Sequence, residues 1–351
     1  MTYITKPAVR HPALEKNALG LTRRDYEGTM STLCAGCGHD SITASIIHAF
    51  FELAIPPHRV AKLSGIGCSS KATAYFMNES HGFNGVHGRM PAIATGANAA
   101  NRDLVYIGIS GDGDSLSIGL GQLCHAIRRN VNMLYVLENN GVYGLTKGQF
   151  SASADVGSVS KRGEVNRHGP INPVSLALTL GATFVARSFS GDRKQLVPIL
   201  KAGLTHRGFA IVDVISPCVT FNDHEGSTKS YAHTRTHNLE VVQTDFVPLM
   251  TEITAEQEQD GATAVTMHDG STVMFRSVAE EYDPTDRDAA LSFLRASQAR
   301  GEVATGLLYL EDSSEDMHVF ENTVDRPLVD IPFAELCPGS AGLEELQKEW
   351  R

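Results

Sequence analysis

The sequence predicts an α/β fold, with a doubly wound, mostly parallel sheet and a C-terminal extension. Between residues 34 and 218, apolar runs of strand length alternate with segments of helical periodicity. These runs are apolar throughout, as in parallel strands that helices cover on both faces. Much of the glycine lies in turns that follow the runs directly, where such sheets bind their ligands.

The elements can be placed in chain order. A helix is predicted at residues 41–53, because its apolar positions recur with helical period and Pro56-Pro57 follows. Strands are predicted at 60–66, 104–110, 131–137, 183–187 and 210–215, and further helices at 116–129, 172–180 and 192–206. The predicted strands therefore present their glycine turns at one edge of the sheet.

After residue 218 the alternation stops. Residues 223–237 are polar without a clear period, and the remainder holds a few short strands and one predicted helix at 287–299. We divide the chain into an N-terminal segment (1–32), a domain of alternating strands and helices (33–225) and an extension (226–351). We expect the extension to contact another subunit and to carry no catalytic domain of its own.

Composition narrows the class of protein. The chain has 351 residues, 42% hydrophobic and 20% charged, with a formal net charge of -10, which argues against a nucleic-acid binder. No apolar run approaches 18 residues and the start lacks a secretory signal, so we expect a cytoplasmic protein with no membrane span. Its six cysteines are then better read as metal ligands or buried thiols than as disulfides.

The first chemical signature is Gly111-Asp112-Gly113-Asp114-Ser115, followed by Asn139-Asn140-Gly141-Val142 with 25 residues between Gly113 and Asn139. A diphosphate bound to a divalent cation needs oxygen ligands and exposed backbone N–H groups. Asp112 offers a carboxylate, Asn140 an amide oxygen and Val142 a carbonyl. Each half alone is a common turn or hairpin signal, but the pair at this spacing, each after an apolar strand, is much rarer.

The pair resembles the fingerprint of thiamine-diphosphate enzymes. The resemblance implies that Asp112, Asn140 and the Val142 carbonyl hold Mg²⁺, and that 33–225 is a thiamine-diphosphate-binding domain. It implies further cofactor contacts from the same turns and from two other loops, at Gly111, Gly113, Asp114, Ser115, Gly144 and Leu145, and at Ile66, Gly67, Cys68, Ser69 and His87. Thiamine enzymes use a second module, which contacts the aminopyrimidine through a glutamate. Too few residues remain for it here, so we expect a partner chain.

The second signature consists of cysteines. Cys34 and Cys37 form a closely spaced pair, and Cys68 and Cys218 each follow a predicted strand. Four thiolates suit either a structural zinc ion or an iron–sulfur cluster, and the residues alone favour neither. A redox dithiol would need a βαβ context that the pair lacks. The thiamine signature favours the cluster, because oxidative decarboxylation requires an electron acceptor close to the cofactor.

Together these motifs resemble the beta subunit of 2-oxoacid:ferredoxin oxidoreductases. CAGCGH, GIGCSS, HGR, ISGDGDSLSIG, ENNGVYGLTKGQ and SPC occur in that family's order between about residues 33 and 223. The resemblance implies a [4Fe-4S] cluster on Cys34, Cys37, Cys68 and Cys218. It also implies an alpha subunit in an α2β2 enzyme, ferredoxin as electron acceptor and coenzyme A as co-substrate, with the reverse, CO2-fixing direction open. Cys124 and Cys337 lie outside the motifs and are read as ordinary thiols.

Two lysines bear on the substrate. In this family the lysines corresponding to Lys71 and Lys147 resemble those that hold the substrate's carboxylates, and pyruvate enzymes often have glycine in place of Lys147. A lysine there can pair with a second carboxylate, which favours 2-oxoglutarate over pyruvate or a broad range of 2-oxoacids. His87 is a further catalytic candidate, while His39 and Arg89 stay open between functional and structural roles. Two alternatives from other classes remain: a non-redox thiamine decarboxylase or carboligase with structural zinc, and a non-catalytic electron-transfer or scaffold subunit that only holds a cluster.

Overall fold

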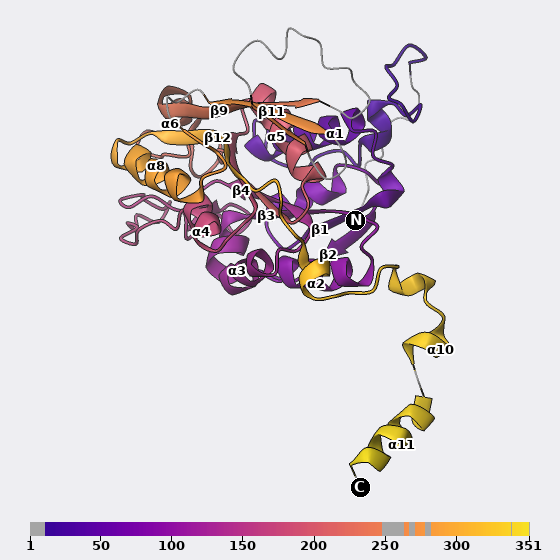
Figure 1. The fold of residues 1–351 in the computed structure, drawn as a ribbon. Coiled ribbons are helices and arrows are strands. Elements are labelled where there is room, and N and C mark those ends of the chain that lie inside the picture. The colour runs from indigo at the N-terminus through magenta and orange to yellow at the C-terminus, as the bar shows by residue number, and fades with distance from the viewer. Residues whose placement is uncertain (1–10, 248–262, 267–270, 278–281, 338, 351) are drawn as a thin grey trace.

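In the computed structural model, which describes residues 11–247, 263–266, 271–277, 282–337 and 339–350, one ten-stranded sheet runs through the molecule (Figure 1). Six neighbouring strands are parallel. In sheet order they are β2 (His81–Asn84), β1 (Val60–Ser64), β3 (Val105–Gly111), β4 (Met133–Asn139), β8 (Phe209–Ile215) and β7 (Phe184–Phe189). The predicted parallel, doubly wound sheet is confirmed.

The sheet continues with strands from the C-terminal part of the chain. In sheet order these are β12 (Val303–Leu310), β9 (Asn238–Val247), β11 (Thr272–Ser277) and β10 (Thr263–Thr266). β12 lies antiparallel to β7, and β9 runs parallel to β12. The division at residues 225 and 226 stays a prediction, but strands from both ranges share this sheet. Residues 1–10 of the predicted N-terminal segment lie outside the described residues.

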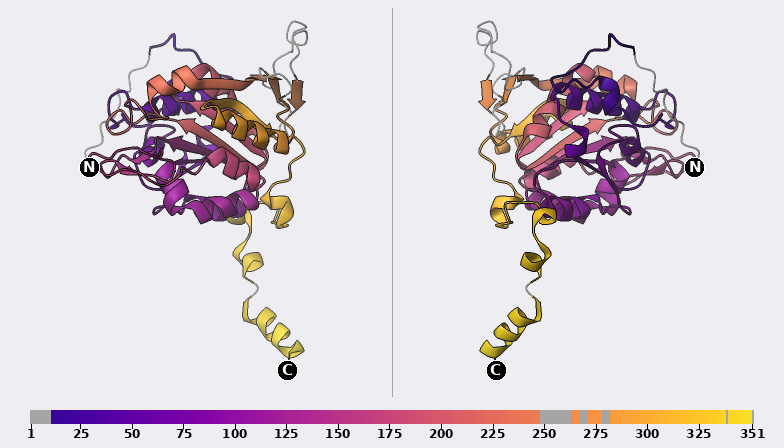
Figure 2. Two further views of the ribbon diagram at one scale, coloured as in Figure 1. Left: turned by 90° about the vertical axis from the view of Figure 1, so that its left-hand side faces the viewer. Right: turned by 90° about the vertical axis from the view of Figure 1, so that its right-hand side faces the viewer.

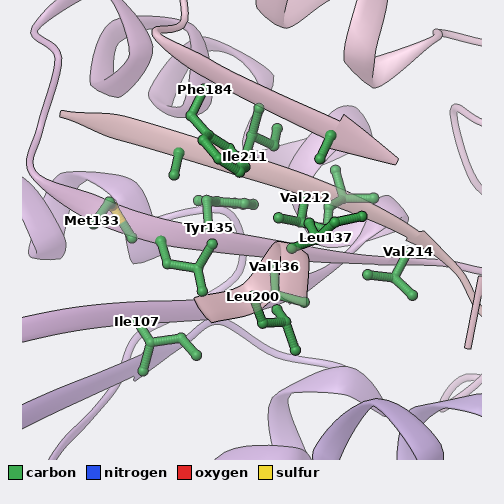
Figure 3. Close-up of a cluster of buried hydrophobic side chains, with 14 of the residues drawn as sticks. Ile107, Met133, Tyr135, Val136, Leu137, Phe184, Leu200, Ile211, Val212 and Val214 are labelled. Atoms are coloured by element: carbon green, nitrogen blue, oxygen red, sulfur yellow. The ribbon is translucent and has the colours of Figure 1, made fainter. Parts of the chain in front are cut away.

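Helices cover the sheet on both faces (Figure 1). On one face α1 (Gly38–Glu52) packs against α5 (Arg193–Thr205), and on the other α2 (Met90–Ala100) packs against α3 (Leu120–Arg128) and α4 (Pro173–Thr179) against α8 (Arg287–Ala299). Between them, β4 and β8 are buried along their whole length. Figure 3 shows this core around Tyr135, Val136 and Ile211, and its continuous burial explains why the strands read as unbroken apolar runs.

Most predicted elements agree with the structure within a few residues. The helix predicted at 287–299 is α8, and Asp192 caps α5 by accepting a hydrogen bond from the Gln195 backbone N–H. The elements that were missed include β2, α2, the short helix α6 (Tyr231–His237) and the helices after residue 316. β2 is fully exposed, and α2 is rich in alanine and glycine, so neither has a clear apolar period. The helix predicted at 116–129 is interrupted, because the π-helical turn η4 (Gly113–Ile118) precedes α3.

The chain ends away from the sheet. After β12 come three short helices, α9 (Met317–Phe320), the 3-10 turn η5 (Leu328–Asp330) and α10 (Phe333–Leu336), and then α11 (Gly339–Glu349). In Figures 1 and 2 the last two helices project from the body, and neither contains a buried residue. Other short elements are the 3-10 turns η1 (Arg23–Tyr26), η2 (Pro57–Arg59) and η3 (Ser69–Ala74), and the two-residue strands β5 (Val142–Tyr143) and β6 (Gln149–Phe150).

Candidate functional site

The site lies at the carboxyl edge of four adjacent strands. β1, β3, β4 and β8 are parallel neighbours, so the turns that follow them meet at one edge of the sheet. A cavity at this edge is lined by residues from three of those turns, from the start of α1 and from the loop before α2: His39, Ile66, Gly67, Cys68, Ser69, His87, Gly111, Asp112, Gly113, Asp114, Asn140, Val142, Tyr143, Gly144, Leu145 and Thr146. The structure thus brings together nearly all residues predicted to contact the cofactor.

Asp112 directly follows β3 and is only 1% exposed. Its Oδ2 accepts hydrogen bonds from the Gly141 backbone N–H (2.9 Å) and from the hydroxyls of Ser151 and Ser153. Burial raises the pKa of this carboxyl group, and these donors oppose the rise. All three donors contact Oδ2, so Oδ1 is left for a cation, which would stabilise the buried charge.

Asn140 and Val142 follow β4 and complete the oxygen set. The Oδ1 atom of Asn140 accepts a hydrogen bond from the Val142 backbone N–H at 3.0 Å, and the Asn140 carbonyl accepts one from the Asn222 side chain at 2.8 Å. The bond from Gly141 to Asp112 ties this turn to the one after β3. A carboxylate, an amide and a carbonyl oxygen on fixed backbone are the hard ligands that Mg²⁺ prefers. The residues present therefore fit the predicted Mg²⁺ and diphosphate.

Gly113 and Gly65 are required by close contacts in the cavity wall. A Cβ at Gly113 would lie 2.5 Å from the Tyr143 ring, whose hydroxyl donates to the Gly113 carbonyl. A Cβ at Gly65 would lie 1.9 Å from the Oδ2 atom of Asp114. The turns after β1, β3 and β4 consequently pack at distances that only glycine allows.

Asp114 connects the loop before α2 to the end of β3. Its Oδ1 accepts hydrogen bonds from the Gly88 backbone N–H and from His87 Nδ1, both at 2.9 Å, and its Oδ2 accepts one from Ser110 at 2.8 Å. Asp114 is 3% exposed, so its carboxylate positions the loop of His87. Ser115 is buried against the Tyr135 hydroxyl at 2.7 Å and does not line the cavity, in contrast to the rest of its motif.

The four predicted cysteine ligands lie close together. Burial raises the pKa of the Cys68 thiol, and the neighbouring Cys218 and Cys34 thiols raise it further. Burial likewise raises the pKa of Cys37 to about 12, with Cys218 among the further causes. A Cβ at Gly144 would lie 3.5 Å from the Cys68 Sγ and 3.6 Å from the Cys218 Sγ. Glycine at 144 therefore leaves room between these two thiols.

All six cysteines are free thiols, as expected for a chain without disulfides. Cys124 and Cys337 lie outside the site cavity. Within the described residues, no three His, Cys, Asp or Glu side chains converge as ligands of a single metal ion would. Four neighbouring thiols, of which Cys68 and Cys218 lie beside Gly144, fit an iron–sulfur cluster by donor chemistry. The metal itself stays a prediction.

His39 and Glu138 form a buried pair. The sequence left the role of His39 open, and it gave no indication of a role for Glu138. His39 Nδ1 lies 3.3 Å from the Glu138 carboxylate and 2.6 Å from the Ser216 hydroxyl, while His39 Nε2 lies 3.5 Å from the Asn140 amide nitrogen. Burial lowers the pKa of His39 to about 4 and raises that of Glu138 well above its usual value. The pair therefore connects the cysteine loops to the oxygen ligands.

The two predicted lysines are exposed and do not line the cavity, although their neighbours Ser69 and Thr146 do. Lys71, in η3, lies near enough to Cys68 to oppose the rise in its pKa. Lys147 has a φ of 80°, a left-handed conformation that costs a residue with a side chain about 1 kcal/mol. A strained backbone at a binding loop favours a functional role for that side chain. Arg89 caps α2 and does not line the cavity.

Sequence reasoning missed Ser151, Ser153 and Tyr143. The two serines hold Asp112 from 39 and 41 residues away in the chain, and no motif marks them. Tyr143 lies inside a recognised motif, but only the packing against Gly113 shows its role. No described helix is both long and apolar enough to cross a membrane.

Comparison with known proteins agrees with this geometry. Residues 65–214 match the family of the thiamine pyrophosphate enzyme C-terminal TPP-binding domain. The chain is 44% identical over 220 residues to the 2-oxoglutarate oxidoreductase subunit KorB of Mycobacterium tuberculosis, covering 60% of this chain and 58% of that one. It is 41% identical over 218 residues to the beta subunit of a 2-oxoacid:ferredoxin oxidoreductase from Sulfolobus sp, covering 62% of this chain and 70% of that one.

A solved structure is similar over most of the fold. It is the 2-oxoglutarate:ferredoxin oxidoreductase from Magnetococcus marinus with 2-oxoglutarate, coenzyme A and succinyl-CoA bound. The likeness has a TM-score of 0.71 at 31% identity and covers 89% of this chain and 92% of the other. The matches to the Mycobacterium and Sulfolobus relatives cover 60% and 62% of this chain, whereas the structural likeness covers 89% of it.

Proposed function

Because this chain belongs to the family of 2-oxoacid:ferredoxin oxidoreductase beta subunits, we propose that it forms, with an alpha subunit, an enzyme that oxidatively decarboxylates 2-oxoglutarate. The reaction is 2-oxoacid + CoA + oxidised ferredoxin to acyl-CoA + CO2 + reduced ferredoxin, with succinyl-CoA as the acyl product. The family match and the thiamine-binding domain support the reaction class, and two lysines support the substrate.

One observation carries the proposal. The loop that follows Asn140 and Val142 also supplies Gly144, which lies against Cys68 and Cys218. The turn that supplies Asn140 and Val142, two of the proposed cation ligands, therefore also contacts two of the cysteines at Gly144. Such an arrangement suits an enzyme that passes electrons directly from a thiamine-bound substrate to a cluster.

In the proposed enzyme the residues of this chain mainly bind and position. Asp112, Asn140 and the Val142 carbonyl hold Mg²⁺, and the turn at Gly113 brings the backbone near the diphosphate. Asp114 fixes the loop that presents His87 to the cavity. Bound thiamine diphosphate supplies a nucleophilic carbon and accepts the electron pair released by decarboxylation.

The four cysteines are proposed to hold a [4Fe-4S] cluster, the first electron acceptor. Cys34 is the most exposed of them, whereas Cys37, Cys68 and Cys218 are half-buried. The exposed side of the set is thus the natural exit for electrons to ferredoxin. The described residues share one main sheet and form no second thiamine module, so we assign the glutamate that contacts the aminopyrimidine to the alpha subunit, in an α2β2 assembly.

Lys147 is proposed to hold the distal carboxylate of 2-oxoglutarate, and Lys71 the carboxylate beside the keto group. Both are exposed, and each stands within two residues of a residue that lines the cavity, Thr146 for Lys147 and Ser69 for Lys71. The left-handed backbone at Lys147 supports this role, because glycine would adopt it without strain. A pyruvate or broad-range enzyme of the same family would have no use for this second charge.

The proposal is tested on protein co-expressed with its alpha subunit and purified without oxygen. We expect about four irons and four sulfides per beta chain, a visible cluster spectrum, and CoA-dependent reduction of a viologen dye by 2-oxoglutarate. A preference for pyruvate would contradict the role of Lys147 and leave the reaction class intact. Zinc without iron, together with no dye reduction, would refute the redox function and favour a non-redox thiamine enzyme.

A further inference from the structure

A buried ion pair lies behind the predicted cation ligands. Asp213, in β8, is completely buried, although every other residue of that strand is apolar. The Nε atom of Arg187, on the neighbouring strand β7, donates to Asp213 Oδ2 at 2.8 Å. A buried ion pair contributes little net stability, because the desolvation of both charges offsets their attraction. Its place in an apolar strand therefore points to a role besides stability.

The ion pair is hydrogen-bonded to Asn139, the residue before Asn140. Asn139 Nδ2 donates to Asp213 Oδ1 at 3.0 Å. A carboxylate paired with arginine can only accept hydrogen bonds, so the nitrogen of the Asn139 amide must face Asp213 and its oxygen must face the other way. That oxygen lies 2.8 Å from Ser153 Oγ. Asp213 thus sets the orientation of the Asn139 amide.

Ser153 lies between Asn139 and the predicted cation ligand Asp112. Its hydroxyl contacts Asp112 Oδ2 as well as Asn139 Oδ1. A hydroxyl has one proton to donate, so these two oxygens compete for it. Whatever share of the proton Asn139 takes leaves more of the Asp112 charge for a cation. The orientation of Asn139 therefore bears on how strongly Asp112 binds its metal.

We propose that Asp213 and Arg187 are positioning residues for the cation site, which orient Asn139 so that its oxygen shares the Ser153 proton with Asp112. The inference rests on the proposed function, in which Asp112 holds Mg²⁺. Loss of a residue that only hydrogen-bonds a metal ligand lowers metal affinity about 10- to 100-fold. Asp213 lies two contacts beyond such a residue, so its effect should be at the lower end of that range.

The test is calorimetric titration with Mg²⁺, in the presence of thiamine diphosphate, of the enzyme co-expressed with its alpha subunit and freed of Mg²⁺. Asp213→Asn keeps the shape of the side chain but has only one oxygen for two donors. Because Arg187 cannot accept, that oxygen should face Arg187, and the new amide nitrogen should turn the Asn139 oxygen away from Ser153. Mg²⁺ binding should then weaken about tenfold.

The matched control is Asp316→Asn. Asp316 is also a buried aspartate, paired with Arg207 Nε at 3.2 Å, and it does not line the site cavity, so Mg²⁺ binding should be unchanged. Ser153→Ala shows whether the effect passes through Ser153. Alone it should weaken Mg²⁺ binding about tenfold, and adding Asp213→Asn should weaken it by less than about a further twofold, because residues in one contact chain are not additive.

If thermal unfolding shows that Asp213→Asn does not fold, Asp213→Leu with Arg187→Met removes both charges together and should give a similar loss of affinity. Unchanged Mg²⁺ affinity in the folded variant would overturn the proposal and leave the proposed function intact. So would an equal loss in Asp316→Asn, or losses from Asp213→Asn and Ser153→Ala that multiply. No Mg²⁺ binding by the unsubstituted enzyme would refute the proposed cation site as well.

Discussion

The two halves of the proposed catalytic edge differ in how fully the protein itself holds their ligand groups in place. In the half that holds oxygen ligands, Asp112 has three hydrogen-bond donors, and Asn140 is bonded at its side chain and its backbone. In the half that holds the cysteines, the thiols raise one another's pKa, and the buried Glu138 carboxylate has, among the described residues, no polar contact beyond the His39 ring 3.3 Å away. The chain itself preorganises the oxygen half, whereas the proposed cluster would complete the thiol half.

This difference has a physical cause. Carboxylate and amide oxygens can be held by backbone N–H and hydroxyl groups that the fold supplies, so they keep their positions without a cation. Thiolates close together repel one another, and burial disfavours their charged form. Binding of iron or zinc removes that cost, which couples the thiol half to its metal.

The largest expected effect comes from breaking the oxygen half. Asp112→Asn keeps the shape and one hydrogen-bond acceptor but removes the charge that faces Mg²⁺, so thiamine-diphosphate-dependent activity should fall about a thousandfold. Titration of Mg²⁺ and thiamine diphosphate measures the loss of binding directly. Asp155→Asn, at a carboxylate paired with Lys229 outside the site cavity, is the matched control. Equal losses in the two variants would contradict the assignment of Asp112.

The next effect comes from the thiol half. Cys218→Ser should lower the iron content and slow dye reduction about a hundredfold. Even the loss of a residue that only hydrogen-bonds a metal ligand lowers metal affinity or activity about 10- to 100-fold, so the loss of a ligand should cost at least as much. Because a bound cluster stabilises only the folded chain, removal of the iron with a chelator should also lower the melting temperature of the unsubstituted protein. Binding of thiamine diphosphate should persist in Cys218→Ser. Loss of both cofactors together would show that the two halves do not act separately.

A smaller effect is expected at Lys147. Lys147→Gly should lower the preference for 2-oxoglutarate over pyruvate about tenfold, because one charge-assisted contact to the distal carboxylate is lost. Glycine relieves the left-handed backbone, so the variant should also be more stable by about 1 kcal/mol. Lys147→Ala is the control, since it loses the charge and keeps the strain. If Lys147→Gly raises the stability but leaves the ratio of 2-oxoglutarate to pyruvate activity unchanged, Lys147 does not contact the distal carboxylate.

The smallest effect is expected outside both halves. Cys337 is exposed and does not line the site cavity, so Cys337→Ser should change stability by no more than about 0.5 kcal/mol. Iron content and the reduction of ferredoxin should equal those of the unsubstituted enzyme. Iron analysis beside Cys218→Ser makes the comparison direct. A loss of iron in Cys337→Ser would place a cluster ligand outside the set proposed here.

The sequence by itself determined the parallel sheet and the residues that line its carboxyl edge. Strands that are buried on both faces give continuous apolar runs, and glycine turns at their ends mark where ligands bind. The local sequence pattern was therefore enough to predict that Asp112, Asn140 and Cys68 lie at the carboxyl edge of the sheet. The tertiary structure alone decided how those groups are held. Ser151 and Ser153 reach Asp112, and Glu138 reaches His39, across long stretches of chain whose spacing carries no local signal. β9 and β12 also join the sheet through long-range pairing, β12 with β7 and β9 with β12. No local period in the sequence encodes which strand pairs with which.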